Sequence, residues 1–164
     1  MGRWRPPQQA GSPYITPEGY QSLQKELKQL WKKRSEVVKA LSEAAAEGDR
    51  SENAEYIYRK KELGGIDRRI RYLQKRLPNL NIIKDKPDTK KVFFGAWVKL
   101  KTDKNKSIKY RIVGADETNQ NDKFISIDSP LAKALLKKSI GDKIELKVDG
   151  GINKFLISQI DYGN

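Results

Sequence analysis

The side chains best suited to chemistry lie in one acidic segment of the chain. The 164-residue sequence has no Cys and no His, which excludes disulfides, thiolate nucleophiles, imidazole bases and metal sites built on either residue. A metal ion, if one is used, would be a hard cation bound by oxygen, such as Mg²⁺. Four carboxylates, Asp49 and Glu52 among them, fall within residues 47–55 and are opposed by a single arginine.

The spacing of Asp49 and Glu52 has two interpretations. An acidic residue followed three positions later by Glu resembles a helix capping box, and acidic side chains are favoured in the first turn of a helix. Two clustered carboxylates also suit a Mg²⁺ ion that is shared with another molecule, because Mg²⁺ is typically held by one or two carboxylates together with water and phosphate oxygens. In two-metal phosphoryl chemistry, such ions stabilise the attacking and leaving oxygens.

A long helix is predicted before this segment, over residues 17–47. Thr16 is placed to act as its N-cap. Apolar residues then recur at steps of three and four from Tyr20 to Ala44, with Arg34 in one position of this seam. A heptad pattern sustained over more than three repeats indicates a coiled coil.

A second long helix is predicted from about residue 51 to residue 77, with Pro78 ending it. Only a few residues separate the two helices, so residues 14–80 should form an antiparallel coiled-coil hairpin whose tip is the acidic segment. Gly64-Gly65 interrupts the second helix, where each glycine disfavours a helix by about 1 kcal/mol relative to Ala. Close approach of the two helices and a flexible point are both open as explanations.

The rest of the chain is predicted to form a tail, a linker and a globular domain. Residues 1–13 are rich in Pro, Gly and Gln and are expected to be a disordered tail. Residues 81–90 are expected to be a linker. Residues 91–164 alternate apolar and polar side chains in several strands, and Ser129 and Pro130 are placed to cap and start a short helix. The predicted fold class is therefore α+β, with a small antiparallel sheet after the hairpin.

The charge of the chain points to an anionic partner. Lys and Arg number 34 against 21 Asp and Glu, so the net charge is +13. Nucleic acid, RNA or DNA, is the first candidate, although such a charge can also serve solubility alone. No apolar run is long enough to span a bilayer, and no secretory signal is visible. We therefore expect a soluble cytoplasmic protein with no membrane partner.

Several segments, in order, carry a resemblance to a known family: ITPEGYQSLQKEL, EGDRSENAEY, IDRRIRYLQKRL, VFFGAWV, YRIVG and SIDSPLAKALLKKSIGD. Residues 14–162 thereby resemble the Gre transcript cleavage factors of bacterial RNA polymerase, the GreB type more than the GreA type. The resemblance implies a coiled-coil hairpin followed by an FKBP-like domain. It also implies a monomeric accessory factor of the polymerase, with no enzymatic activity of its own.

The resemblance further implies a mechanism and assigns roles to residues. The hairpin enters the polymerase secondary channel when the enzyme has backtracked and extruded the RNA 3′ end. Asp49 and Glu52 then help to hold the second Mg²⁺, which binds weakly or not at all to the free protein, and they orient the attacking water. The polymerase's own active site cuts the RNA, and elongation restarts from the new 3′ hydroxyl.

Two further sets of residues match the family. Arg59, Lys60 and Lys61 fall where the GreB type carries a basic patch for extruded RNA, although a solvated helix face explains each of them about as well. Asp128, Ser129 and Pro130 match the family's contact with the polymerase rim, and simple helix capping also accounts for them. Helix capping and contact with the polymerase rim can both hold for Asp128, Ser129 and Pro130.

Two other functions remain open on the sequence. One is a secondary-channel regulator that inhibits the polymerase without stimulating cleavage, against which the Asp-Arg-Ser-Glu sequence argues. The other is a free-standing nucleic-acid-binding module, which the charge permits although no base-reading motif is visible.

Overall fold

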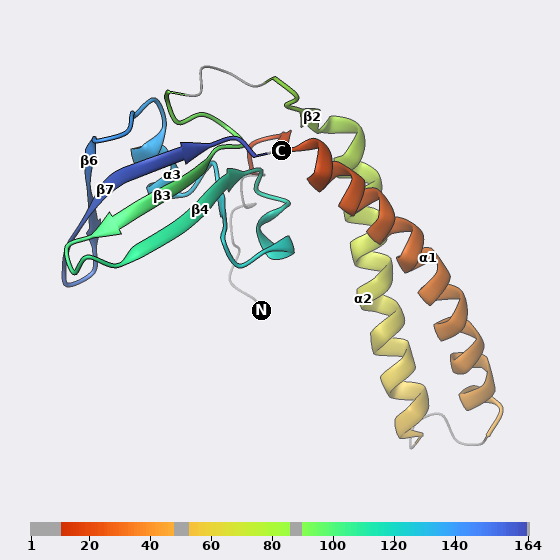
Figure 1. Cartoon of the computed structure of the whole chain (residues 1–164). Helices are drawn as coiled ribbons and strands as arrows, with labels where there is room; N and C mark the ends of the chain where they lie inside the picture. The colour runs from red at the N-terminus through yellow and green to blue at the C-terminus, as the bar shows by residue number, and fades with distance from the viewer. Residues whose placement is uncertain (1–10, 48–52, 86–89, 164) are drawn as a thin grey trace, which may run out of the picture. The chain divides into compact units, whose positions relative to one another are not determined.

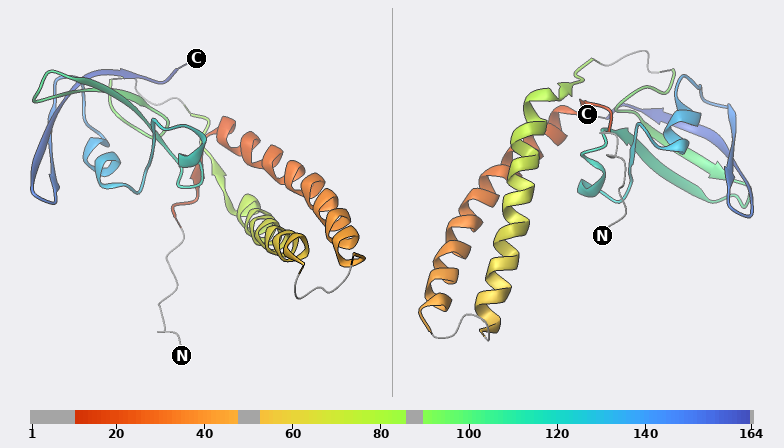
Figure 2. Two further views of the ribbon diagram at one scale, coloured as in Figure 1. Left: turned by 90° about the horizontal axis from the view of Figure 1, so that it is seen from below. Right: turned by 180° about the vertical axis from the view of Figure 1, so that it is seen from behind.

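The computed structural model describes residues 11–47, 53–85 and 90–163, and the chain divides into two compact units (Figures 1 and 2). One unit is the helical region Tyr20–Leu80. The other is globular and combines Met1–Gly19 with Asn81–Asn164. The first residues of the long N-terminal helix therefore belong to the globular unit.

The helical unit is the predicted antiparallel hairpin. Its elements are α1 (Pro17–Ala45), α2 (Ala54–Arg76) and the 3-10 helix η1 (Leu77–Asn79). Apolar side chains from both helices form one seam: Val37, Ile66 and Ile70 are buried, and Leu27, Leu30 and Leu63 pack against them. The start predicted for the second helix is wrong by three residues, because the N-cap of α2 is Asn53.

Three ion pairs among the described residues join the helices beside this seam, and the longest of them places Lys33 Nζ 3.9 Å from Glu62 Oε2. The Nε of Arg34 donates to Asp67 Oδ1 at 2.7 Å, which explains an arginine in a seam position. Arg69 donates through Nε and one terminal nitrogen to the two carboxylate oxygens of Glu26, at 2.6 and 3.0 Å. A bidentate pair of this kind fixes the relative orientation of its partners, so it sets the register of the two helices.

The helix α2 continues through Gly64 and Gly65 without a break. A Cβ built at Gly64 would lie 3.4 Å from the terminal nitrogen of Arg68, and one at Gly65 would lie 3.8 Å from the other terminal nitrogen. No atom of α1 comes within 4 Å of either position among the described residues. Close approach of the two helices is therefore the wrong explanation for the glycines.

We expect the double substitution Gly64→Ala/Gly65→Ala to stabilise the hairpin. Each alanine should add up to about 1 kcal/mol to the free energy of unfolding, because alanine loses less backbone entropy in a helix and the space for its Cβ is open. Urea unfolding followed by circular dichroism at 222 nm measures the change. A midpoint equal to or below that of the wild type would contradict it.

The globular unit contains one curled five-stranded sheet, in the order β5-β4-β3-β7-β6 (Figure 1). The predicted α+β class is confirmed, and the antiparallel arrangement predicted for the sheet holds for three of its four strand pairs. The exception is β5, which runs parallel to β4, so the sheet is mixed. The elements are β3 (Trp97–Thr102), β4 (Ser107–Val113), η2 (Thr118–Gln120), β5 (Phe124–Ser126), α3 (Pro130–Leu135), β6 (Lys143–Val148) and β7 (Gly151–Asp161).

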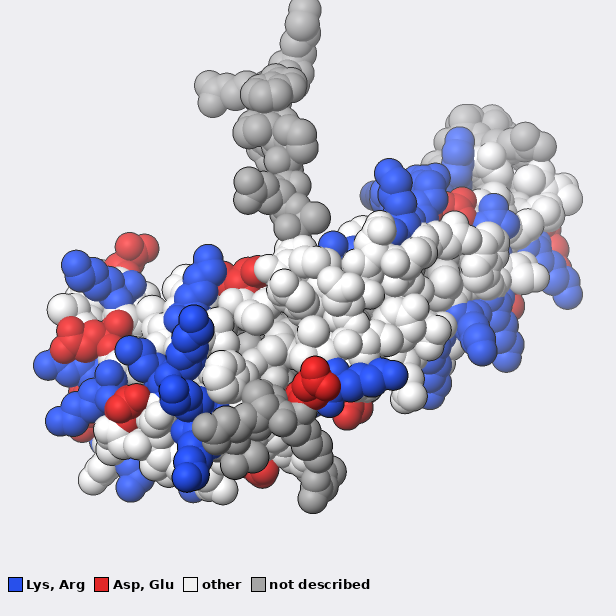
Figure 3. Space-filling model, turned by 90° about the horizontal axis from the view of Figure 1, so that it is seen from above, with Lys and Arg blue, Asp and Glu red and all other residues white. Residues whose placement is uncertain are grey.

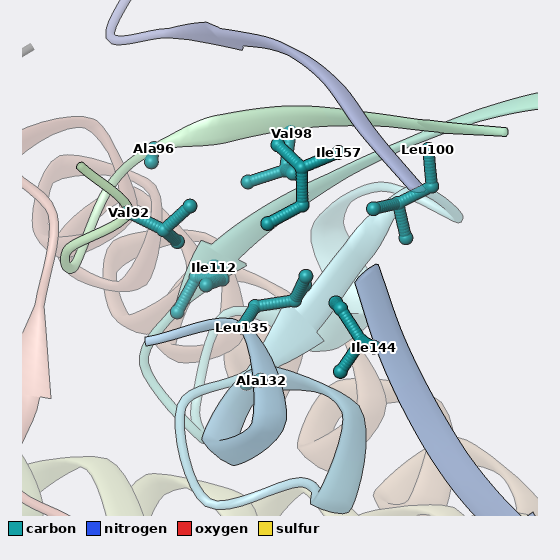
Figure 4. Packing of buried hydrophobic residues seen from close by; sticks show 9 residues of the cluster. All are labelled: Val92, Ala96, Val98, Leu100, Ile112, Ala132, Leu135, Ile144 and Ile157. Carbon is teal, nitrogen blue, oxygen red and sulfur yellow. The ribbon is translucent and has the colours of Figure 1, made fainter. Parts of the chain in front are cut away.

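The core of this unit lies between the sheet and α3 (Figure 4). Val98 and Leu100 of β3 point from the sheet toward Leu135 of α3, and all three are fully buried. Because successive residues of a strand point to opposite faces, the residues between them face away from α3. The helix thus covers one face of the sheet and leaves the other to solvent among the described residues.

A second, two-stranded sheet pairs the strand before the hairpin with the strand that follows it. Here β1 (Tyr14–Ile15) runs parallel to β2 (Asn81–Ile82). The predicted linker over 81–90 therefore begins in a strand. Ser12, placed in the predicted tail, donates from its backbone N to Asp128 Oδ2 at 2.8 Å and from its hydroxyl to Oδ1. Disorder is thus the wrong prediction for Ser12, and residues 1–10 lie outside the described part of the chain.

A buried carboxylate holds the first turn of α1. As predicted, Thr16 caps this helix, its hydroxyl accepting a hydrogen bond from Gly19 N at 3.1 Å. The same hydroxyl donates to Glu117, which is fully buried and also accepts from Thr16 N at 3.1 Å and Gly114 N at 2.6 Å. A Cβ on Gly19 would come within 1.9 Å of the Glu117 carboxylate, so the close packing requires glycine there.

Burial raises the pKa of the Glu117 carboxyl above its ordinary value, although hydrogen bonds from Thr16 and Gly114 and the charge of Arg111 oppose the shift. The folded protein therefore holds this proton more tightly than the unfolded chain. The resulting stabilisation is complete below about pH 4.5, the ordinary pKa, and is lost as the pH rises through the folded-state value.

We expect Glu117→Gln to remove this dependence on pH. The melting temperature of the wild type should fall relative to that of the variant as the pH rises above about 4.5. Thermal unfolding of both proteins across pH 4–8, about the range in which a raised carboxyl titrates, measures the difference. Substitution of the exposed Glu36 by Gln is the control, and parallel curves for Glu117→Gln and the wild type would contradict the prediction.

Candidate functional site

The acidic tip lies between the ends of α1 and α2. Asp49 and Glu52, the predicted metal ligands, lie outside the described residues. The described chain stops at Glu47, whose backbone N donates to Ala44 O at 3.2 Å, and resumes at Asn53. Because the two helices are antiparallel, residues 48–52 connect them at the end of the hairpin opposite to Tyr20 and Leu80.

Asn53 fastens the two helices together at the border of this connection. Its Oδ1 accepts from Tyr56 N at 3.1 Å, which makes it the N-cap of α2. Its Nδ2 donates to Ala44 O at 2.7 Å, near the end of α1. The capping box predicted from Asp49 is therefore wrong as an account of where α2 begins. Asn is a preferred N-cap residue, and this preference was the available signal for Asn53.

The predicted RNA-contacting residues differ in their surroundings. Arg59 donates to Glu55 and Glu62, at 2.9 Å each, along the same helix. These hydrogen bonds, the one to Glu62 first, raise the pKa of the Arg59 guanidinium. Lys60 and Lys61 are exposed, and neither is in an ion pair with a described residue. The two lysines are therefore the members of this set whose charges are available to a polyanion.

The predicted rim contact lies at the start of α3. Ser129 is the N-cap of this helix and accepts from Ala132 N at 3.2 Å, and Pro130 is its first residue, so the capping role is confirmed. Asp128 is half-buried and its carboxylate binds Ser12. Pro130 is exposed. The role of these three residues in binding another protein stays a prediction.

The part of the chain that the structure describes contains no cluster of three or more acidic residues that could hold a metal ion. The donors predicted for Mg²⁺ are the two carboxylates of the tip. Carboxylate oxygens are the ligands that Mg²⁺ prefers, and two of them leave the rest of an octahedral shell to water or to another molecule. The donor set thus fits a shared ion and remains a prediction.

Comparison with protein families decides the affiliation of the chain. Residues 13–82 match the family profile "Transcription elongation factor, N-terminal", and residues 86–162 match "Transcription elongation factor, GreA/GreB, C-term". The chain belongs to the GreA/GreB family of transcription elongation factors. Residues 83–85 separate the two matches, close to the point where the helical unit ends at Leu80 and the globular unit resumes at Asn81.

Relatives in this family span the whole chain. Transcription elongation factor GreB of Xanthomonas axonopodis pv. citri is 52% identical over 100% of this chain and 99% of its own length. GreB of Pseudomonas aeruginosa is 49% identical over 99% of this chain and 98% of its own. Among solved structures, Thermus aquaticus Gfh1 aligns with a TM-score of 0.43 at 27% identity, covering 92% of this chain and 99% of that one.

The helices of the described residues also show whether any of them could cross a membrane. None of them combines the length and the apolar character that crossing a bilayer requires.

We expect Asn53→Ala to loosen the tip end of the hairpin. Losing an N-cap costs about 1 kcal/mol, and the bond to Ala44 is lost as well. Asn53→Asp is the matched variant, because aspartate also caps a helix but cannot donate to the Ala44 carbonyl. Hydrogen exchange should show a less protected Tyr56 amide in the Ala variant and a protected one in the Asp variant. Equal protection of Tyr56 in Asn53→Ala and the wild type would contradict the assignment.

Proposed function

We propose that this protein rescues backtracked bacterial RNA polymerase by stimulating the polymerase's own endonucleolytic cleavage of the RNA 3′ end. It would act in the cytoplasm as an accessory factor, without an active site of its own. The observation that carries the proposal is the pair Asp49 and Glu52 in the short connection between two long paired helices. The affiliation with the GreA/GreB family and the identity of about half to GreB proteins support it.

The dimensions of the hairpin suit delivery of the tip into a narrow channel. With 29 residues, α1 is roughly 43 Å long at 1.5 Å per residue. Its partner α2 has 23 residues. One apolar seam and three interhelical ion pairs among the described residues hold them together, and the hairpin is only two helices wide. Asn53 closes the end that carries the tip, which keeps the helices paired up to the connection.

Two carboxylates at the tip have a defined chemical task in this proposal. A Mg²⁺ ion bound there would activate a water molecule for attack on the phosphodiester bond. Asp49 and Glu52 would complete part of the shell of an ion whose other ligands come from the polymerase and the RNA. A carboxylate oxygen not bound to the ion can accept a hydrogen bond from the attacking water and orient it.

The extruded RNA would lie along α2. Lys60 and Lys61 follow the tip by less than three turns of helix, and their charges are available to phosphates. Arg59 donates to Glu55 and Glu62, so its charge is already paired and it would contribute less to RNA binding than the two lysines. The rim of the polymerase channel would be contacted at the start of α3, where Pro130 is exposed beside Asp128 and Ser129.

We expect Asp49→Asn/Glu52→Gln to abolish most of the stimulated cleavage in backtracked elongation complexes. Removing groups that stabilise charge in a transition state typically lowers a rate by roughly 100-fold or more. The loss should be greatest at limiting Mg²⁺ and smaller when Mg²⁺ is in excess. Cleavage of end-labelled RNA is measured on gels, with Glu36→Gln/Glu43→Gln, exposed on α1, as the control of equal charge.

Two results would count against the proposal. Full cleavage by the tip variant at limiting Mg²⁺ would show that the carboxylates are not required. Blocked elongation without any shortened RNA, given by the wild-type protein, would instead identify an inhibitor of the polymerase with the same architecture.

A further inference from the structure

The outer face of the five-stranded sheet carries a concentration of positive charge. This face is turned away from α3 and toward the viewer of Figure 1. Residues that alternate with the buried core side chains of four strands point outward on it. Seven of them are basic (Lys99, Lys101, Lys109, Arg111, Lys143, Lys147 and Lys154), against the acidic Glu145 and Asp161. Figure 3, turned by 90° from the view of Figure 1, shows Lys and Arg together with Asp and Glu on the surface of the globular unit.

Two of these lysines face each other across neighbouring strands. Lys99 of β3 is directly opposite Lys109 of β4 in the register of the sheet, and Lys101 follows on the same face. Like charges in directly opposed positions destabilise a sheet. None of these three lysines is in an ion pair with any described residue. An anion bound across the strands would relieve this repulsion.

An aromatic pair lies at one end of the basic face. Trp97 is opposite Arg111, and its ring centroid is 5.9 Å from that of Phe124 on β5. The Nζ of Lys109 is 5.2 Å from the Trp97 ring centroid. Both rings are half-buried, so part of their surface is accessible. Aromatic rings among positive charges are typical of surfaces that bind single-stranded nucleic acid, where bases stack and phosphates are neutralised.

A hollow lies at the other end of the same face. Its volume is about 460 Å³, and its lining includes Lys101, Lys143, Lys154 and the apolar side chain of Leu156. The lining also includes the acidic residues Asp103 and Glu145, and Glu145 is 3.9 Å from Lys154, so the three lysines exceed the carboxylates of the lining by one. The basic surface therefore continues from the aromatic pair across β4 and β3 to β7 and β6.

We propose that this outer face, defined by Trp97, Lys99, Lys101, Lys109 and the hollow beside Lys143, binds single-stranded nucleic acid without reading its sequence. Lysines two residues apart on one strand are roughly 6.7 Å apart, and neighbouring strands are about 4.8 Å apart, so a flexible phosphate chain can meet several of them at once. This surface shares no residue with Lys60 and Lys61 of the hairpin or with the start of α3. The proposal does not rest on the cleavage function.

The test measures binding of the full-length protein to a fluorescein-labelled oligo(U) of about 20 nucleotides, by fluorescence anisotropy at several salt concentrations. This length exceeds the roughly 4–16 nucleotides that one single-strand-binding domain covers. Lys99→Gln/Lys101→Gln/Lys109→Gln should weaken binding roughly tenfold or more. It should also lower the slope of log affinity against log salt by about 2, since each neutralised phosphate of a single strand contributes about 0.7. The three side chains are exposed, so the fold should persist.

The matched control is Lys25→Gln/Lys28→Gln/Lys32→Gln, which removes the same charge from exposed positions of α1. Its affinity and salt slope should stay close to those of the wild type. A second measurement uses Trp97 as the sole tryptophan, in a Trp4→Phe/Trp31→Phe background, and its fluorescence should be quenched when oligo(U) binds.

Three results would overturn the proposal. The first is an unchanged affinity and slope in the sheet variant, or equal losses in the sheet and α1 variants. The second is tighter binding of duplex DNA than of oligo(U), which would exclude a single-stranded ligand. The third is equally tight binding of a polyglutamate peptide of equal charge, which would indicate an acidic protein partner. The tip variant Asp49→Asn/Glu52→Gln should bind oligo(U) normally, so this test and the cleavage test fail independently.

Discussion

The buried carboxylate of Glu117 is the interaction on which the beginning of the hairpin depends. It joins the N-cap of α1 to the turn after β4, because it accepts hydrogen bonds from both Thr16 and Gly114. Glycine at position 19 lets the carboxylate approach the first turn of the helix. A negative group at a helix N-terminus is also favoured by the helix dipole, which offsets part of the free energy needed to bury it.

Pairing of the two helices beyond this point combines apolar packing with directional contacts. The seam around Val37 and Ile66 is narrow, as expected for two helices that can bury only one stripe each. The bidentate pair of Arg69 with Glu26 and the bond from Arg34 to Asp67 add registry that apolar packing does not specify. At the far end, Asn53 supplies both a cap and a link between the helices. The proposed role of the tip depends on these contacts, because they keep the two helices paired from one end to the other.

Positive charge is distributed over surfaces with different environments. On α2, Arg59 is engaged by two carboxylates whereas Lys60 and Lys61 are not paired with described residues. On the sheet, Lys99 and Lys109 face each other without carboxylate partners among the described residues. The net charge of the chain does not distinguish cations that are paired with carboxylates from cations that are not. Local pairing determines which cations are available to phosphates, and this is why the two proposals concern different residues.

The sequence by itself determined the hairpin, the Thr16 and Ser129 caps and the α+β class, because heptad spacing, capping residues and strand alternation are local patterns. It also determined the family, through segments spread along the chain. Tertiary structure decided the parallel pairing of β5 with β4, the anchoring of Ser12 by Asp128, and the burial of Glu117. Each of these joins residues distant in sequence or sets a strand direction, and no local pattern encodes such contacts. A tertiary contact likewise placed Asn53 between the helices, through its bond to Ala44. The engagement of Arg59 by Glu55 and Glu62 is instead local, because these residues are four positions before and three positions after it on α2.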